Sequence, residues 1–308
     1  MSKKSYFGVS GVARNVKSWP VGIGNVARKA KSGYFGVGGV ARNFLGGVDP
    51  VLNNNDWATI LAVSDAGQGA NYWSVGDYKN IQISGNVQGM SLNSTVRAFI
   101  LGFNHNSAKE GSNRIHFQVG KTTSGTDIAF CDYIYGGGNH GYNQGFLMNL
   151  SRTNSGGWNG SYGRNTLLGN SGTPTSPPAN SFMAALPADL RAVMKPVTKY
   201  TDNAGNSDKA SAVTATTDYL FFLAEFEVQG ARSHANPYEQ NYQAQYDYYK
   251  AGNSKVKYSH RATSDAVYHW CRSAHYYTSN SFCFVSNKGI ADYAYANNSY
   301  GLAPGFAV

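Results

Sequence analysis

The first 47 residues repeat with a strict period of 14 residues. The period is marked by Gly8, Gly22 and Gly36, by Ala13, Ala27 and Ala41, and by Arg14, Arg28 and Arg42. Each repeat places two short Val-containing stretches on either side of a turn, a pattern that is typical of a two-stranded hairpin. Because a single hairpin is marginally stable in water, three in tandem predict a module that stacks on itself, on copies in other chains or on a partner. A flexible basic arm is the alternative.

The formal net charge of +9 is concentrated in these repeats. Residues 1–47 contain eight Lys and Arg side chains and no Asp or Glu, whereas the remaining residues contain 18 basic and 17 acidic side chains. A duplex-binding domain spreads its basic side chains over the folded body, so we expect no nucleic-acid binding by the main part of the chain. No apolar run approaches the roughly 18 residues of a membrane span, so we also expect no such span.

The chain is poor in charged residues and rich in glycine and tyrosine. Charged residues make up 14% of it, and it contains 36 Gly and 22 Tyr. Few charges and many glycines disfavour helix bundles and coiled coils, and we expect an α+β fold. We assign residues 1–47 to the repeat module, residues 48–55 to a linker and residues 56–308 to a second domain.

Local patterns predict the elements of this second domain. We expect strands at residues 57–63, 72–75, 80–83, 95–103, 114–119 and 218–228. We expect helices at residues 157–168, 188–194 and 236–252. The last of these begins with Asn236 as N-cap and Pro237 in the first turn, and Glu239 stands three residues after the cap. The tyrosines of this helix fall on one face, namely Tyr238, Tyr242, Tyr246 and Tyr249.

The sequence contains no strong catalytic signature. Glu225 and Glu227 would share one face of an extended strand, with Cα atoms roughly 7 Å apart, and a pair of carboxylates is what a glycoside hydrolase uses. A structural role, such as pairing with Arg232, is the favoured interpretation. The seven histidines form no HExxH or HxH pair, and no calcium-ligand spacing stands out. We therefore expect neither enzyme activity nor a bound metal or cofactor.

The segment of residues 268–300 is enriched in aromatic side chains. It contains nine of them in 33 residues, against 14% in the whole chain, and the remainder is mainly Ser, Asn, Ala and Gly. Such a mixture is typical of an evolved binding surface, in which rigid aromatic anchors stand beside small adaptable polar groups. Alternation along the expected hairpin predicts that small side chains point inward and that large rings point to solvent, namely Phe282, Phe284, Tyr293 and Tyr295. In the alternative register, Phe282 and Phe284 belong to the core.

Thirteen residues of this segment are candidate ligand-binding residues. Each belongs to the residue types that are reached from an asparagine codon by changing only its adenines, which is compatible with mutagenesis directed at adenines. The segment also contains no Glu, Gln or Met. The candidates are His269, Cys271, His275, Tyr276, Tyr277, Phe282, Phe284, Ser286, Ile290, Asp292, Tyr293, Tyr295 and Tyr300.

Several short motifs connect the chain to a known type of domain. They are Gly157-Trp158, Arg164 to Leu168, Leu186-Pro187, Asp218 to Leu223 with Glu225 and Glu227, Trp270 to Ser273, and Gly301 to Phe306. In combination they resemble an uncharacterised domain of gut-bacterial and phage proteins that is related to C-type-lectin-like folds, over about residues 56–308. The repeats resemble short repeats of phage structural proteins. The chain departs from the usual W-L-R-S-P and G-V-R-P motifs of that domain, and the departures are Cys271, Ala274, Leu302 and Ala303.

This resemblance implies a C-type-lectin-like domain preceded by a short β-hairpin repeat module. Domains of this kind with a mutable C-terminal stretch are targets of diversity-generating retroelements, and in phages they act as tail receptor-binding proteins. The resemblance therefore implies a virion protein of the tail tip or fibre, synthesised in the host cytoplasm, that binds a protein or glycan of the host surface through the 13 candidates.

The same resemblance implies the partners of the other segment. Residues 1–47 are expected to attach the chain to a tail or baseplate protein, and tail fibres commonly assemble as homo-oligomers, so we expect a trimer. Two alternative functions stay open. One is a structural virion or baseplate decoration protein without a variable ligand, and the other is a carbohydrate-active enzyme that uses Glu225 and Glu227.

Overall fold

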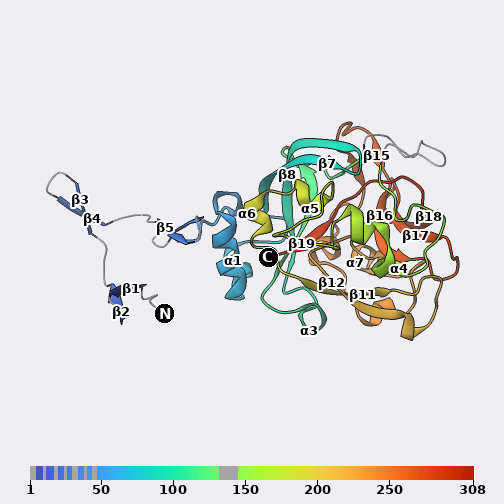
Figure 1. Ribbon diagram of the computed structural model, residues 1–308, viewed down its shortest axis with the longest axis horizontal. Coiled ribbons are helices and arrows are strands. Elements are labelled where there is room, and N and C mark those ends of the chain that lie inside the picture. The colour runs from blue at the N-terminus through green and yellow to red at the C-terminus, as the bar shows by residue number, and fades with distance from the viewer. Residues whose placement is uncertain are drawn as a thin grey trace. The chain divides into compact units, whose positions relative to one another are not determined.

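A computed structural model describes residues 47–131 and 145–308, and between residues 5 and 43 it describes the backbone of six strands (Figure 1). The chain divides into two compact units, residues 1–48 and residues 49–308. Within the part of the chain that is described, no helix is both long enough and apolar enough to cross a membrane.

Each repeat of the smaller unit forms one antiparallel hairpin. The hairpins are β1 (Ser5–Val9) with β2 (Val12–Val16), β3 (Pro20–Ile23) with β4 (Val26–Lys29), and β5 (Tyr34–Val37) with β6 (Val40–Asn43). All three share one register, in which the repeated glycine pairs with the repeated alanine: Gly8 with Ala13, Gly22 with Ala27, and Gly36 with Ala41. The turns of the three hairpins lie outside the described residues.

The larger unit is a mixed α+β structure with several antiparallel sheets. Its main sheet has five strands that curl into a half-barrel, in the order β13 (Leu220–Phe221), β19 (Gly305–Ala307), β9 (Ile115–Thr122), β8 (Met90–Phe103) and β7 (Tyr78–Val87). Strand β8 pairs with both neighbours and contains two irregularities, at residues 97–98 and 100–102. Because bulges bend a strand and increase its twist, they help the long β8 to curl with the sheet.

The segment of residues 57–63 is a helix, and the strand expected there is wrong. Helix α1 spans Trp57–Asp65, and the Asp56 carboxylate caps it by accepting a hydrogen bond from the Thr59 N–H. The apolar face of α1 packs on the main sheet, where the Trp57 ring lies 5.6 Å from that of Phe117. Residues 69–72 form helix α2 (Gly69–Tyr72), so a strand at residues 72–75 is also wrong. The expected linker is ordered, because Asn55 is buried and bonds the backbone of Asp49.

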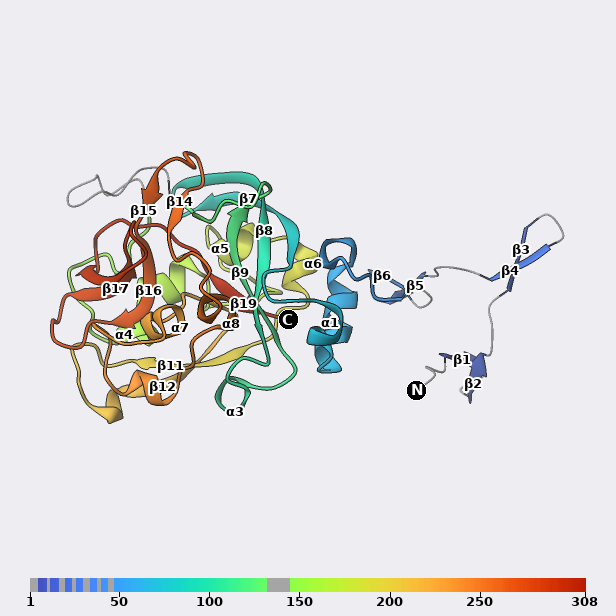
Figure 2. The same ribbon diagram turned by 180° about the vertical axis from the view of Figure 1, so that it is seen from behind.

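Three smaller sheets complete the larger unit. The first contains β10 (Ile128–Ala129), β14 (Lys257–Ser259) and β15 (Ala266–Val267); the second is a ribbon of β11 (Val197–Asp202) and β12 (Val213–Asp218); the third contains β16 (His269–Ala274), β17 (Ser281–Val285) and β18 (Ala291–Tyr295). The third sheet and helix α1 lie at opposite ends of the larger unit (Figures 1 and 2).

The remaining helices are all short. They are α3 (Ser107–Glu110), α4 (Gly157–Gly160), α5 (Phe182–Ala185), α6 (Ala188–Arg191), α7 (Glu225–Gln229) and α8 (Asp247–Lys250). The single-turn helices are η1 (Leu52–Asn54), the π-helix η2 (Gly163–Leu167), η3 (Ala210–Ala212) and η4 (Glu239–Asn241). The helix expected at residues 157–168 is thus two pieces, α4 and η2, and α7 replaces the end of the strand expected at residues 218–228.

The long helix expected at residues 236–252 is absent, and only η4 and α8 form there. Tertiary hydrogen bonds replace the helical ladder: the backbone N–H of Tyr246 donates to the Glu227 carbonyl at 3.0 Å. Tyr242, Tyr246 and Tyr249 do pack inward as expected, but against different elements, whereas Tyr238 is exposed. Tyr242 stacks on Tyr200, and the Tyr249 hydroxyl donates to Gln118 Oε1 at 2.7 Å.

Candidate functional site

The third sheet carries most of the 13 candidate residues, and its register decides which of them reach the surface. Strand β17 lies between β16 and β18, so β18 is the edge strand. Phe282 pairs with Ala294, whereas Cys283 pairs with Tyr293. Because directly paired residues of antiparallel strands share a face, the Phe side chains of β17 and the Tyr side chains of β18 lie on opposite faces.

The phenylalanines of β17 belong to the core, so the prediction that their rings face solvent is wrong. Phe282 and Phe284 are buried. The Phe284 ring stacks on Tyr268 with centroids 5.0 Å apart, and it also contacts Trp270 and Tyr300. The physical reason is that β17 is buried along its whole length, on both of its faces. Side-chain alternation along such a strand does not separate core from surface.

The tyrosines of β18 and of the preceding loop do face solvent. Tyr277 is 78% exposed, and Tyr293 and Tyr295 are each 42% exposed. Tyr276 is half-buried beside Tyr277, with ring centroids 6.0 Å apart. These four tyrosines, Tyr276, Tyr277, Tyr293 and Tyr295, form what we call the aromatic face.

Two histidines support the aromatic face from below. The Tyr293 ring stacks on the buried His275 ring with centroids 3.9 Å apart, and His234 lies 5.1 Å from the same tyrosine. Burial and the nearby His234 lower the pKa of His275 to about 4. A neutral His275 can accept hydrogen bonds at Nδ1, and it does so from the Thr278 N–H and from the Thr278 hydroxyl, both at 3.0 Å.

Asn154 fixes the loop that carries Tyr276 and Tyr277. Its buried Nδ2 donates to the carbonyls of Thr278 at 2.7 Å and Ser281 at 2.9 Å, and its backbone N–H donates to the Ser279 carbonyl at 2.8 Å. The loop backbone is therefore held by a residue from a distant part of the chain. Ordering the loop before a ligand arrives reduces the entropy that binding has to overcome.

Glu225 holds the neighbouring loop, which carries His234. Its carboxylate accepts hydrogen bonds from the backbone N–H groups of Ser233, His234 and Ala235, at distances between 2.6 and 3.1 Å. The side chain is fully buried. Charge-assisted bonds of this kind are strong, so Glu225 fixes the position of His234 beneath Tyr293.

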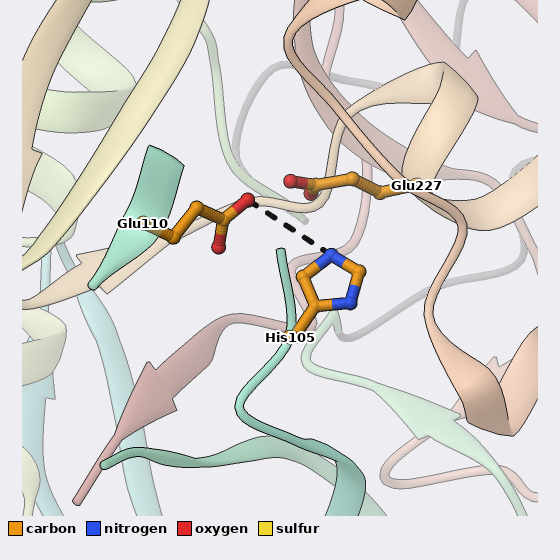
Figure 3. Close-up of side chains that lie close together, drawn as sticks. All are labelled: His105, Glu110 and Glu227. Carbon is orange, nitrogen blue, oxygen red and sulfur yellow. Dashed lines mark ion pairs between the residues drawn. The ribbon is translucent and has the colours of Figure 1, made fainter. Parts of the chain in front are cut away.

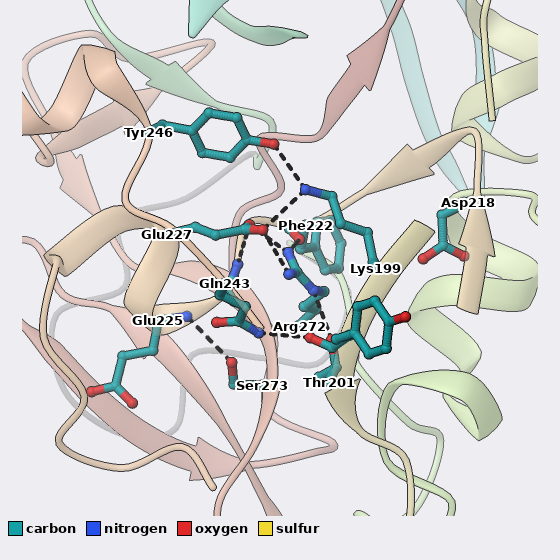
Figure 4. A network of polar contacts seen from close by, with 12 residues as sticks. Lys199, Thr201, Asp218, Phe222, Glu225, Glu227, Gln243, Tyr246, Arg272 and Ser273 are labelled. Carbon is teal, nitrogen blue, oxygen red and sulfur yellow. Dashed lines mark hydrogen bonds and ion pairs between the residues drawn. The ribbon is translucent and has the colours of Figure 1, made fainter. Parts of the chain in front are cut away.

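A buried charge network lies behind the third sheet (Figure 4). Arg272 of β16 donates to the two Glu227 carboxylate oxygens at 2.5 and 2.7 Å, and to the Phe222 carbonyl at 2.9 Å. Lys199 of β11 donates to Glu227 at 3.0 Å and to Glu110 at 2.6 Å. The network thereby links β16 to β11, α7 and α3, and it makes a rigid support for the aromatic face.

Glu239 forms a second buried contact with β16. It accepts hydrogen bonds from the Ser273 hydroxyl at 2.7 Å, from the Asp202 N–H at 2.9 Å and from Gln243 Nε2 at 3.0 Å. Burial raises the pKa of Glu239 to about 7, and burial likewise raises the pKa of Glu110 to about 7. These carboxyl groups therefore titrate near neutral pH inside the protein.

His105, Glu110 and Glu227 bring possible metal ligands together (Figure 3), with ligand atoms within 4.8 Å of one another. The Lys199 ammonium donates to both carboxylates of this group. A buried carboxylate pair requires a compensating positive charge, and Lys199 supplies it at that position. The group is accordingly part of the charge network, and we assign no metal to it.

The comparisons with known proteins concern the half of the chain that carries the aromatic face. A family model described as a domain of unknown function, DUF6273, matches residues 146–308, which is more than half of the chain. The chain belongs to the DUF6273 family. No curated protein and no solved structure matches it. The DUF6273 region contains the whole third sheet together with Arg272, Glu227 and Glu239.

Several sequence motifs of the DUF6273 region meet in its framework. The Trp158 Nε1–H donates to Asp218 Oδ2 at 2.9 Å, and Arg164 Nε donates to Asp218 Oδ1 at 2.6 Å. Gly157 has a φ of +50°, and a Cβ there would overlap the Asp202 carbonyl oxygen. Such a backbone position requires glycine. These motif residues are buried or half-buried and hold the fold together, so they lie apart from the exposed surface.

The structure divides the 13 candidates into two groups. Those at or near the surface are Tyr276, Tyr277, Ile290, Asp292, Tyr293 and Tyr295. Those that are buried are His269, Cys271, His275, Phe282, Phe284, Ser286 and Tyr300. The side chains of the second group lie in the interior beneath the surface group, and a direct contact between them and a ligand stays a prediction.

Sequence reasoning missed the residues that position the aromatic face from outside residues 268–300. They are Asn154, Glu225, His234, and two arginines that lie over its rings, Arg152 over Tyr295 and Arg232 over Tyr276. No motif or spacing marks these residues, because each reaches the face through tertiary folding. For Glu225 and Glu227 the sequence favours a structural role, but the partner it suggests, Arg232, differs from those in the structure, which are backbone N–H groups for Glu225 and Arg272 for Glu227.

Proposed function

We propose that the chain is a binding protein that captures a host-surface ligand on the aromatic face, as a receptor-binding component of a phage tail. One observation carries the proposal: Tyr277, Tyr293 and Tyr295 are exposed, while Asn154 anchors the loop that follows Tyr277 and Glu225 anchors the loop that places His234 beside Tyr293. Clustered exposed aromatic rings mark interaction sites. Tyrosine offers a large contact area and loses little side-chain entropy on binding.

The proposal includes a C-type-lectin-like character for the larger unit and a diversified C-terminal segment. It narrows the diversified positions to the six candidates at or near the surface, because changes there leave the core intact. The hairpins of the smaller unit would attach the chain to a tail or baseplate protein and to sister copies in a trimer. Several copies on one virion would then strengthen a modest affinity by multivalency.

The burial of both carboxylates favours binding over hydrolysis. Glu225 and Glu227 are each 0% exposed. Glu225 accepts backbone hydrogen bonds, and Glu227 is held by Arg272 and Lys199. A glycoside hydrolase requires both carboxyl groups to reach the glycosidic bond. This arrangement supports the interpretation of the pair as structural residues.

The test compares cell binding by the wild-type chain with binding by a variant in which all four tyrosines of the aromatic face are replaced by alanine. The labelled proteins are applied to a panel of gut-bacterial cells. We expect the variant to lose binding and to keep the thermal unfolding temperature of the wild type. Tyr238→Ala is the matched control, because Tyr238 is 40% exposed and directly precedes η4 rather than belonging to the face.

Two results would contradict the proposal. Undiminished cell binding by the fourfold variant would exclude the aromatic face as the ligand site. Absence of binding by the wild type to every cell type would instead favour a structural virion protein. Sequencing the neighbouring DNA tests diversification separately: we expect a reverse-transcriptase gene and a near-copy of the last roughly 120 bases that differs at adenines. A locus without them contradicts the diversified segment.

A further inference from the structure

A hollow of about 310 Å³ lies beside the segment that carries Arg152, and Ser151 and Thr153, the two chain neighbours of Arg152, both line it. Residues 149–155 form one wall, and residues 160–166 form the opposite wall. Its volume is at the lower end of the range for small-molecule sites. The residues that line it include Ser, Thr, Asn and Tyr side chains, and none of them is charged. A hollow of this chemistry suits a neutral, hydroxyl-rich part of a ligand.

Its walls are held in place, yet several of its hydroxyls have no protein partner. Asn149 Nδ2 donates to the Thr153 carbonyl at 2.7 Å, and Asn149 Oδ1 accepts from the Tyr162 N–H at 2.9 Å. Among the described residues, none forms a hydrogen bond with the side-chain hydroxyls of Ser151, Ser155 or Thr166. The hollow therefore presents the hydroxyls of Ser151 and Ser155 on one wall and that of Thr166 on the opposite wall, and Asn149 bonds the backbone of both walls.

Arg152 presents an uncompensated charge next to this hollow. Its guanidinium lies 3.5 Å from the centroid of the Tyr295 ring, and within the described part of the chain no carboxylate lies within 4.0 Å of it. Arg164 and Arg272, by contrast, are both paired with carboxylates. A guanidinium that is held flat on an aromatic ring is ordered before binding, and it is suited to bind a carboxylate through two hydrogen bonds.

Resting on the proposed ligand-binding function, we infer that residues 149–155 form a subsite for an acidic saccharide. Arg152 binds the carboxylate, and the hydroxyls of Ser151, Ser155 and Thr166 bind the hydroxyls of the sugar ring. Leu150, which is 69% exposed, and Tyr295 offer apolar surface to the C–H groups of the same ligand. Apart from Tyr295, the residues of the subsite lie outside residues 268–300, so they extend the aromatic face with positions that need not vary when the face does.

The combination of the two features favours a saccharide over an acidic peptide. Arg152 alone would suit either ligand, because both carry carboxylates. A sugar also presents several hydroxyls at short spacing, and these match the uncharged, hydroxyl-lined hollow. An acidic peptide presents one amide per residue and no dense array of hydroxyls. The hollow therefore distinguishes the two classes, and the peptide becomes one outcome of the test.

The test titrates the full-length chain with glucuronic acid and measures Kd by saturation-transfer NMR. Glucose is the neutral probe, and tetraglutamate is the peptide probe. We expect binding of glucuronic acid to exceed that of glucose, and Arg152→Gln to weaken it about tenfold or more, since hydrogen bonds to a charged group are lost. Gly160→Leu, which places a side chain into the hollow, is expected to weaken it as well. A Cβ at Gly160 meets only the Ser155 carbonyl oxygen, at 3.7 Å.

Arg97→Gln is the matched control, because Arg97 also lies over a tyrosine ring, that of Tyr78 at 3.7 Å, but on strand β8. It removes one positive charge and should leave the Kd unchanged. Binding to the basic repeats would be insensitive to all three substitutions, so it is distinguished from binding at Arg152. Thermal unfolding of every variant reports whether it is folded. Arg152→Lys separates the effect of the positive charge from that of the planar guanidinium, because lysine retains only the charge.

Three results would overturn the subsite: equal affinity for glucose and glucuronic acid, a Kd for glucuronic acid that is insensitive to Arg152→Gln, or Arg152-dependent binding of tetraglutamate alone. If any of these occurs while the fourfold tyrosine variant loses cell binding, the subsite fails and the proposed function stands. If Arg152-dependent binding of glucuronic acid is found while that variant still binds cells, the subsite stands and the proposed function of the aromatic face fails.

Discussion

The buried carboxyl group of Glu239 makes the stability of the larger unit depend on pH. Burial raises its pKa from 4.5 to about 7, against the opposing effect of hydrogen bonds from the Asp202 N–H and the Ser273 hydroxyl. A carboxyl group whose pKa is raised on folding stabilises the folded state below its unfolded pKa, and this contribution is lost as the pH rises through the folded pKa. A rise from 4.5 to about 7 corresponds to about 3 kcal/mol.

The substitution Glu239→Gln removes this titration, because the amide is uncharged at every pH. We predict that the free energy of unfolding of the variant, relative to that of the wild type, increases by about 3 kcal/mol between pH 4.5 and pH 8. Other buried groups titrate too: burial lowers the pKa of His105 to about 3 and that of His275 to about 4, so both destabilise the fold in acid. Their contribution is common to both proteins and cancels in the difference.

Urea unfolding at several pH values measures this difference, with fluorescence of the buried Trp158 and Trp270 as the signal. The midpoint and slope give the free energy of unfolding at each pH. If the variant and the wild type differ by an amount that is constant to within about 0.5 kcal/mol from pH 4.5 to pH 8, Glu239 does not titrate as its burial requires. Burial would then not raise the pKa of Glu239 as proposed.

Two further predictions concern the third sheet and the buried charge network behind it. Phe282→Ala should lower the free energy of unfolding by about 3–5 kcal/mol, because it empties a fully buried site. Tyr277→Ala should change it by no more than about 0.5 kcal/mol, because Tyr277 is exposed. Equal effects of the two substitutions in urea unfolding would contradict the register of β17. Glu227→Gln should lower it by about 3–5 kcal/mol at pH 7, since Arg272 loses its buried counter-charge. Despite its burial, Arg272 and Lys199 hold the pKa of Glu227 below its usual value, so this loss should shrink as the pH falls below about 4.5, and a pH-independent loss would refute the ion-pair explanation.

Local sequence patterns predict a helix or strand well where its own residues determine its conformation. They predict it poorly where contacts with distant residues determine that conformation. The long antiparallel strands β8 and β9 were expected, because their runs of β-branched and aromatic residues suit a sheet. Helix α1 was misread as a strand, although Asp56 is a good N-cap, because the apolar residues that follow it fit both patterns. At residues 236–252 Asn236 Oδ1 does accept a hydrogen bond from the Tyr238 N–H, but its Nδ2 donates to Asp202 and to the Lys209 carbonyl, and only the short η4 follows.

The aromatic face was partly predictable from the sequence. Alternation along β18 gave the exposure of Tyr293 and Tyr295 correctly, because an edge strand there presents one face to solvent. The same rule failed for Phe282 on β17, since the sequence does not reveal that this strand is central and covered on both faces. Arg152 and Asn154 could not be assigned either, because more than 120 residues of chain separate them from the tyrosines that they contact or position.

The position of β18 at the margin of its sheet has a consequence for how the protein evolves. Side chains at Ile290, Asp292, Tyr293 and Tyr295 are exposed, so exchanging them disturbs the buried residues of β16 and β17 little. Substitutions that change binding specificity can therefore accumulate there one residue at a time, each with little loss of folding stability. A protein whose ligand changes would then alter its binding specificity while its free energy of unfolding stays nearly constant.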